Sequence, residues 1–279
     1  MAYLNPTIGT LKPAPLPRGR LLDLIPSTGE EVRWFNGVSW TPWPSRGLLT
    51  QDVDACNPDP STDIDRYCVP AVDQPTFRLL DALTASALEF TPAELTTLLA
   101  DRFALITSWA FASELLSGAA SGGNALSKAA HAPTGMAFGA AATPVWNALA
   151  VIEADLALTL YGGAGIIHMP PSMMVIAQEY LVPDGNRWTT PSGHLVVFDG
   201  GYTNAPPPEG EAASAAGEDW IYASGPVAHA LTSPKLVGST DDAFYLEKNL
   251  YEVYMESYGL LQFDAAPVTA VLASYSQAA

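Results

Sequence analysis

The chain has 279 residues, a length that suits one large domain or a core with a protruding subdomain. Hydrophobic residues make up 48% of it and charged residues only 15%, which excludes a disordered chain. Because 12 Lys and Arg stand against 29 Asp and Glu, the formal net charge of −17 repels a phosphate backbone and argues against sequence-specific nucleic-acid binding.

The N-terminal segment, residues 1–19, carries repeated prolines and no periodic apolar face. We expect an extended arm that becomes ordered against a neighbouring subunit, or else a frayed tail. It has no basic region followed by an apolar stretch, so we expect no secretory signal. The most apolar windows, residues 148–160 and 163–177, contain charges, glycines or prolines, so we expect no membrane span.

A β-hairpin is predicted after this segment. Residues 21–25 form an apolar run, residues 26–29 a turn sequence, and residues 31–35 an alternating run. Three tryptophans crowd the same extended chain, namely Trp34, Trp40 and Trp43. So much aromatic surface on so little local structure needs a partner surface, either on a neighbouring subunit or in the core of the same chain.

Residues 52–75 are rich in Asp and Pro and predict a loop, and residues 77–83 then predict a strand. Cys56 and Cys68 lie in this loop, with no further Cys or His nearby to complete a zinc site. We expect free thiols, with a disulfide that closes the loop as the alternative.

A long helix over residues 92–117 is the clearest element. Thr91 can cap it, Pro92 suits its first position, Glu94 completes a capping box, and Gly118 ends it. At 1.5 Å per residue the helix is about 39 Å long, far longer than an average globular helix.

The rest of the chain predicts a flexible loop, two helices and several strands. The loop covers residues 119–142, and the helices run from Thr143-Pro144 to Gly162-Gly163 and, capped by Ser172, through Leu181. Strands are expected over residues 164–169, 194–198, 220–224, 227–231, 249–258 and 270–273, with an exposed loop over 206–219. The tally is α+β.

No motif for catalysis or cofactor binding emerges. Residues 161–165 look like a dinucleotide loop but lie between a helix and a strand in the reverse order. The histidines have no paired spacing for a metal and are better explained as structural; they are His131, His168, His194 and His229.

Neither Ser192 nor Ser224 stands on a strand-to-helix elbow of the kind that presents a catalytic serine. Glu153 and Asp155 point to different faces of their helix, so we expect a solvated edge in place of an acid–base pair.

In order, these elements are an extended segment, a hairpin, a long helix ending in Glu114-Leu115-Leu116-Ser117-Gly118, a loop, a second helix and closing strands. This order resembles the Hong Kong 97-type shell fold of tailed-phage major capsid proteins and encapsulins. The long helix is similar to the family's spine helix. Residues 145–161, 165–169 and 171–173 are similar to the start of its axial domain, and residues 253–258 and 267–271 to its closing pattern.

The resemblance implies an α+β Hong Kong 97-type capsid fold in five parts. They are an N-terminal arm over 1–19, an extended hairpin loop over 20–50, a peripheral domain over 51–143 with its spine helix over 92–117, an axial domain over 144–245, and closing strands of the peripheral domain over 246–279. Some family members carry an N-terminal coiled coil that acts as a scaffold, or cross-link through a lysine near the hairpin tip. We expect neither here.

The resemblance further implies a structural protein with no catalytic, cofactor-binding or metal-binding residues. We expect a major capsid subunit of a tailed bacteriophage, which assembles with copies of itself into hexamers and pentamers of an icosahedral head around double-stranded DNA. The DNA is contacted only non-specifically, and the acidic charge is compatible with a wall past which it slides, or with solubility alone. The implied further partners are scaffold, decoration and portal proteins, with no membrane.

Such a subunit assembles in the host cytoplasm and ends in the virion head. Two alternatives remain on a related fold, an encapsulin-like compartment shell and a minor head or connector protein. From a different class, the alternatives are an α+β hydrolase and a carbohydrate-binding module that uses Trp34 and Trp40.

Overall fold

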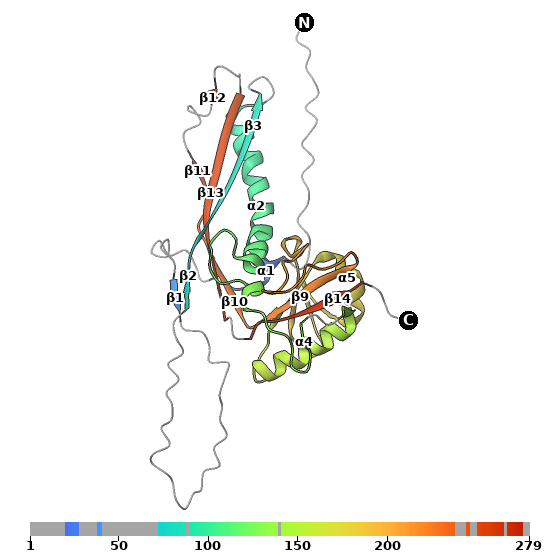
Figure 1. The fold of residues 1–279 in the computed structure, drawn as a ribbon. Helices are drawn as coiled ribbons and strands as arrows, with labels where there is room; N and C mark the ends of the chain where they lie inside the picture. The colour runs from blue at the N-terminus through green and yellow to red at the C-terminus, as the bar shows by residue number, and fades with distance from the viewer. Residues whose placement is uncertain are drawn as a thin grey trace, which may run out of the picture.

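The computed structural model describes residues 20–27, 38–40, 72–86, 90–138, 141–237, 244–245, 250–264 and 267–275. Figure 1 shows an elongated part, formed by α2 (Pro92–Ser117), β3 (Phe77–Ser86) and β13 (Leu250–Phe263), beside a compact part. We call the first the spine and the second, built around a seven-stranded sheet, the compact region. The expected arm over residues 1–19, and Cys56 and Cys68, lie outside the described residues.

The helix of the spine, α2, begins and ends where the sequence predicts. Thr91 Oγ1 accepts a hydrogen bond from the Glu94 backbone N–H at 3.3 Å, and the Glu94 carboxylate accepts one from the Thr91 backbone N–H at 2.8 Å. The predicted capping box is therefore confirmed. Gly118 ends the helix in the left-handed conformation, with φ of 58°.

A five-stranded antiparallel sheet forms the second layer of the spine. β13 lies at its centre and pairs along one side with all of β3, from Leu250 opposite Ser86 to Gly259 opposite Phe77. Along its other side it pairs with β10 (Val227–Leu231), β11 (Lys235–Val237) and β12 (Phe244–Tyr245). The buried residues between α2 and this sheet are Leu95, Leu99, Phe103, Val253 and Met255.

The sheet of the compact region is mixed. Its strands, in spatial order, are β4 (Thr143–Pro144), β14 (Thr269–Ser274), β9 (Glu218–Ser224), β5 (Ile166–Met169), β8 (Leu195–Phe198), β7 (Arg187–Thr189) and β6 (Val182–Asp184). Along β9, Trp220 and Tyr222 belong to one buried cluster, and Ile221 and Ala223 to another. Because successive side chains point to opposite faces, both faces of this sheet are buried.

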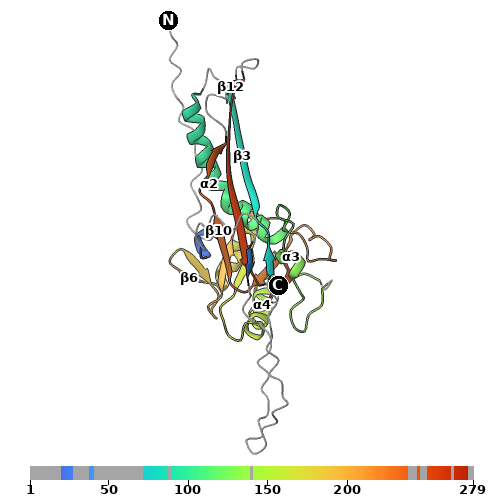
Figure 2. The same cartoon turned by 90° about the vertical axis from the view of Figure 1, so that its left-hand side faces the viewer.

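Different helices cover the two faces. α4 (Val145–Thr159) and α5 (Pro171–Ala177) pack on one. α1 (Leu21–Leu24), α3 (Leu126–Ala129) and the C-terminal half of α2, with Phe111 and Leu115, pack on the other. Figure 2 shows α2 running from the spine into the compact region. One helix thus contributes to both cores and joins the two parts.

Most of the predicted elements are confirmed. They include the helix α4 and the strands β3, β5, β8, β9, β10, β13 and β14. α4 stops at a turn in which Tyr161 and Gly162 have positive φ angles of 52° and 82°. A glycine such as Gly162 adopts this conformation readily, as expected at the end of a helix. The order helix, turn, strand at residues 161–165 is the reverse of a dinucleotide loop.

The apolar run over residues 21–25 was predicted as a hairpin strand, and this is wrong, because residues 21–24 form α1. The backbone N–H of Leu21 donates to Asp199 Oδ2 at 3.1 Å, so a carboxylate distant in sequence satisfies the start of the helix. A short apolar run does not by itself distinguish a buried strand from a helix.

Three further local predictions differ from the structure. The loop over residues 119–142 contains α3, whose Leu126 is fully buried. The short helix begins at Pro171, with Pro170 and not Ser172 at its N-cap, and continues as the 3₁₀ helix η2 (Gln178–Tyr180). β2 (Val72–Gln74), within the loop predicted over 52–75, pairs with β1 (Val38–Trp40).

The strands near the chain end belong to two different sheets. The family resemblance groups residues 246–279 as closing strands of the peripheral domain; in the structure β13 lies in the spine sheet and β14 in the sheet of the compact region. Likewise β10 and β11, within the expected axial domain over 144–245, pair with β13. The chain therefore crosses between the two parts more often than the element order alone indicates.

Candidate assembly surfaces

A serine and a histidine do meet in the compact region, which the sequence did not predict. His168 Nε2 lies 2.9 Å from Ser224 Oγ, and His168 Nδ1 lies 2.8 Å from the Tyr202 hydroxyl. Because Ser224 Oγ donates to the Gly225 carbonyl, it accepts from His168 Nε2–H, and the Tyr202 hydroxyl donates to Nδ1.

This network does not suit catalysis. His168, Tyr202 and Ser224 are buried, and burial lowers the pKa of His168 from 6.5 to about 3. Burial also raises the pKa of the Tyr202 hydroxyl well above its ordinary value. A histidine with so low a pKa is a poor base, and water and substrate do not reach the serine. The three side chains satisfy one another inside the core.

The other histidines are separate from one another. His131 Nε2 lies 3.3 Å from Asp155 Oδ2, His194 Nδ1 accepts from the Gly165 backbone N–H, and the His229 backbone N–H donates to Pro26. Burial lowers the pKa of both His194 and His229. Within the described part of the chain, no group of three His, Cys, Asp or Glu side chains is arranged to hold a metal ion.

The expected solvated edge at Glu153 and Asp155 is wrong for Asp155, which is only 2% exposed. Its carboxylate accepts from the Thr134 backbone N–H at 3.0 Å and from the Thr134 hydroxyl at 3.2 Å, and it faces His131. Asp155 thus holds the segment after α3 against α4 through hydrogen bonds. Glu153 lies in a groove beside α4.

Of the three tryptophans of the predicted hairpin, the structure describes one. Trp34 and Trp43 lie outside the described residues, and Trp40 is described as the last residue of β1, through its backbone pairing with Val72. Of the helices that the structure does describe, none combines the length and apolar character needed to cross a bilayer.

Asp199 connects the compact region to α2 and α1. Its Oδ2 accepts from the Leu21 backbone N–H and from Ser108 Oγ at 2.9 Å, and its Oδ1 accepts from the Gly201 backbone N–H at 3.0 Å. Gly201 packs so closely that a Cβ there would overlap the carbonyl oxygen of Trp109 on α2. The junction between the two parts is therefore rigidly packed.

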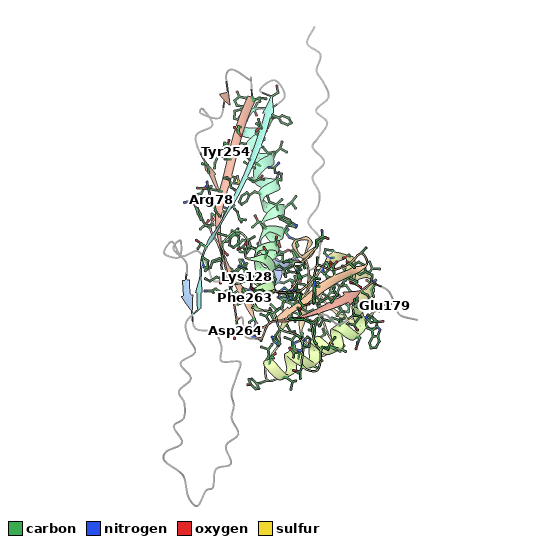
Figure 3. All side chains as sticks on the ribbon, viewed as in Figure 1. Arg78, Lys128, Glu179, Tyr254, Phe263 and Asp264 are labelled. Atoms are coloured by element: carbon green, nitrogen blue, oxygen red, sulfur yellow. The ribbon has the colours of Figure 1, made fainter. Side chains whose placement is uncertain are left out.

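The spine presents a second sheet face that points away from α2. Leu79, Leu83 and Leu236 pack toward α2, so the alternating residues Leu80 and Val237 point outward, and both are exposed. Beside them Arg78 on β3 pairs with Glu256 on β13 at 2.6 Å. Figure 3 shows Arg78 and Tyr254 along this elongated part. A mixed apolar and charged face of this kind suits contact with another protein.

The compact region carries a groove between α4 and the segment that leads into β6. It has a volume of about 370 Å³ and is lined by Trp146, Leu149, Ala150, Glu153, Glu179, Tyr180, Leu181, Val182, Thr190 and Pro191. Trp146 is 51% exposed, and Tyr180 and Val182 are exposed beside it. Sequence reasoning missed this surface, although Trp146 stands beside the buried stripe of α4 and not on it.

No family model matches the sequence, and a search of curated proteins finds no match. Solved structures do match over nearly the whole chain. The capsid of a native GTA particle aligns with 98% of this chain and 96% of its own, with a TM-score of 0.56 at 14% identity. A structure of Gordonia phage Cozz aligns with 99% of this chain and 92% of its own, with a TM-score of 0.55 at 14% identity.

The holo-SrpI encapsulin complex of Synechococcus elongatus is similar to the same degree. It aligns with 93% of this chain and 89% of its own, with a TM-score of 0.56 at 12% identity. Identities this low concern the fold alone. The α+β Hong Kong 97-type fold expected from the order of elements is confirmed.

Proposed function

We propose, from the Hong Kong 97-type fold that the chain adopts, that it is the major capsid subunit of a tailed bacteriophage. Copies of the chain form hexamers and pentamers and close into an icosahedral head around double-stranded DNA. Scaffold, decoration and portal proteins are its further partners. Assembly takes place in the host cytoplasm, and the finished protein resides in the virion head.

One observation carries the proposal. The chain aligns with capsid structures from end to end, including the long spine, with 92% or more of each partner covered. If this chain were an enzyme or a binding module that shared only a core with the capsid proteins, a large part of one of the two aligned chains would have no counterpart in the other. Here both the compact region and the spine have counterparts.

The surfaces agree with a protein that meets copies of itself. The spine exposes Leu80 and Val237 on its outer face, and the compact region exposes Trp146 and Tyr180 at its groove. Apolar and aromatic residues on two separate faces suit heterologous contacts, in which each copy offers one face to one neighbour and the other face to the next. The net charge of −17 agrees with a wall that holds packed DNA without binding it tightly.

An experiment on native particles tests the proposal. Particles that contain this chain are purified from their source, treated with nuclease, and analysed for protein and nucleic acid. We expect this chain to be the most abundant protein and double-stranded DNA to survive the nuclease. Particles with a single copy or a few copies of the chain contradict a major capsid role and indicate a minor head or connector protein.

The encapsulin match supports a second candidate, a compartment shell, because its TM-score equals that of the GTA capsid. The same preparation distinguishes the two. A shell without DNA that contains an enzyme supports the compartment, whereas protected DNA supports the capsid.

A further inference from the structure

The groove of the compact region is lined by both apolar and acidic residues. Trp146, Tyr180 and Val182 supply exposed apolar surface, and Glu153 and Glu179 supply carboxylates. Figure 3 shows Glu179 on the side of the compact region away from the spine, where a neighbouring molecule has access. Exposed aromatic residues such as these are enriched at protein interfaces.

Glu153 makes the groove favourable for a positively charged group. Its Oε1 is buried and accepts no hydrogen bond from the described residues. The titratable side chain that acts on it from the neighbouring segment is His194, whose pKa is lowered by burial and raised to a lesser degree by the charge of Glu153. A buried carboxylate oxygen without a hydrogen-bond donor costs free energy, so a cation brought to the mouth of the groove stabilises Glu153.

A suitable cation lies on the same region of the chain. Arg187 stands at the turn of the β6–β7 hairpin, where it pairs in register with Asp184. Its side chain is exposed, and no ion pair within 4.0 Å joins it to any residue in the described ranges. Figure 2 shows β6 at the edge of the compact region.

We propose that the β6–β7 turn of one copy docks on the groove of the next, with Arg187 facing Glu153 and the turn covering Trp146 and Tyr180. The contact is heterologous, with each copy offering its turn to one neighbour and its groove to the next, and such contacts repeated around an axis close into a ring. The inference rests on the proposed shell function and assigns one contact within its rings.

Charge reversal tests the contact. Arg187→Glu places a carboxylate against Glu153, and Glu153→Lys places an ammonium against Arg187, so each variant alone weakens assembly. Loss of one partner of a desolvated charge pair corresponds to about a thirtyfold or larger rise in the concentration needed for assembly. The double variant restores the attraction with its sign reversed. Lys128→Glu, which reverses an exposed cation on α3 away from both the groove and the outer face of the spine, is the charge-matched control and has no such effect.

A mixture of the two single variants distinguishes a contact between copies from one within a chain. If the contact joins copies that alternate around a six-membered ring, the carboxylate introduced by Arg187→Glu faces the ammonium introduced by Glu153→Lys, whereas a five-membered ring does not allow strict alternation. At the next contact the unchanged Arg187 of one variant faces the unchanged Glu153 of the other, so the mixture assembles although each variant alone does not. Within a chain, each variant keeps its own like-charged pair, so only the double variant recovers.

The measurement is mass photometry of assembled rings and shells over a range of protein concentrations, with circular dichroism to confirm folding. Should Glu153→Lys disturb the fold, Glu153→Gln preserves the shape and is expected to weaken assembly to a smaller degree. Formation of six-membered rings by the mixture supports the contact. Normal assembly of both single variants, or rescue by the double variant alone, overturns it while leaving the shell function intact. Wild-type protein that never assembles overturns the shell function as well.

Discussion

The compact region and the spine bury their apolar residues to different degrees. In the compact region, helices cover both faces of the seven-stranded sheet, and the alternation along β9 places every second side chain in one of two buried clusters. In the spine, α2 packs on one face of β3 and β13, and Leu80 on the other face is 52% exposed. One chain is thus enough to complete the compact core, whereas the outer face of the spine keeps apolar residues exposed.

The largest effect is expected in the compact core. Leu156 on α4 is fully buried, so Leu156→Ala lowers the free energy of unfolding by about 4 kcal/mol. Leu158→Ala on the same helix removes an exposed leucine and changes it by less than about 0.5 kcal/mol. Chemical denaturation of the unassembled protein measures both. Equal effects would show that this face of α4 is not packed as described.

Acid is expected to weaken the compact region through His168. Its pKa is about 3 in the folded protein against 6.5 ordinarily, so the unfolded chain binds the proton first as the pH falls. The stability that neutral His168 contributes is present above pH 6.5 and is lost as the pH falls toward 3. The slope is about 1.4 kcal/mol per pH unit.

Unfolding titrations between about pH 6 and about pH 4 measure this slope. His194 and His229, whose pKa values are also lowered by burial, act in the same direction. His168→Gln removes the contribution of His168 to the slope of the free energy of unfolding against pH. Tyr202→Phe keeps His168 buried and leaves that contribution in place. A slope that persists undiminished in His168→Gln contradicts the assignment.

The junction between the two parts depends on Asp199. Asp199→Asn replaces an acceptor oxygen with an amide donor that faces the Leu21 N–H, Ser108 or the Gly201 N–H. We expect the free energy of unfolding to fall by about 2 kcal/mol, because one of these donors loses its acceptor. Hydrogen exchange should then increase in α1 and in the C-terminal half of α2. An increase confined to the tip of the spine would mean that Asp199 does not hold the junction.

The smallest effect is expected at the tip of the spine. Thr91→Ala removes the side-chain cap of α2 and costs about 1 kcal/mol. Hydrogen exchange at the first turn of α2 reports the loss, with Thr97→Ala as a control because the Thr97 hydroxyl donates to the Ala93 carbonyl and caps nothing. If the two variants behave alike, the capping box contributes no stability.

An element is predicted well from the sequence when the residues that determine its ends lie close to it along the chain. Thr91, Pro92, Glu94 and Gly118 lie within or beside α2, and they fix both of its ends. α1 was misjudged because its first N–H is satisfied by Asp199, far along the chain. The separation of β13 and β14 into two sheets likewise depends on tertiary pairing and not on their own sequences.

The candidate surfaces follow the same rule. Trp146 and Glu153 lie seven positions apart on α4, a spacing that places them near one face, but the groove needs Tyr180 and Val182 from a later segment. The Ser224–His168 pair was also not foreseen, because β9 and β5 become neighbours only in the folded sheet. The order of elements, through its resemblance to a known shell fold, therefore predicted the fold, while the surfaces became visible only in the structure.

Electron microscopy of the purified protein, prepared at low and at high salt, tests the central claim most directly. We predict closed shells of uniform diameter, in which a reconstruction places every copy with its compact region in a ring and its spine between neighbouring copies. Small monodisperse monomers under all salt conditions would contradict a shell subunit.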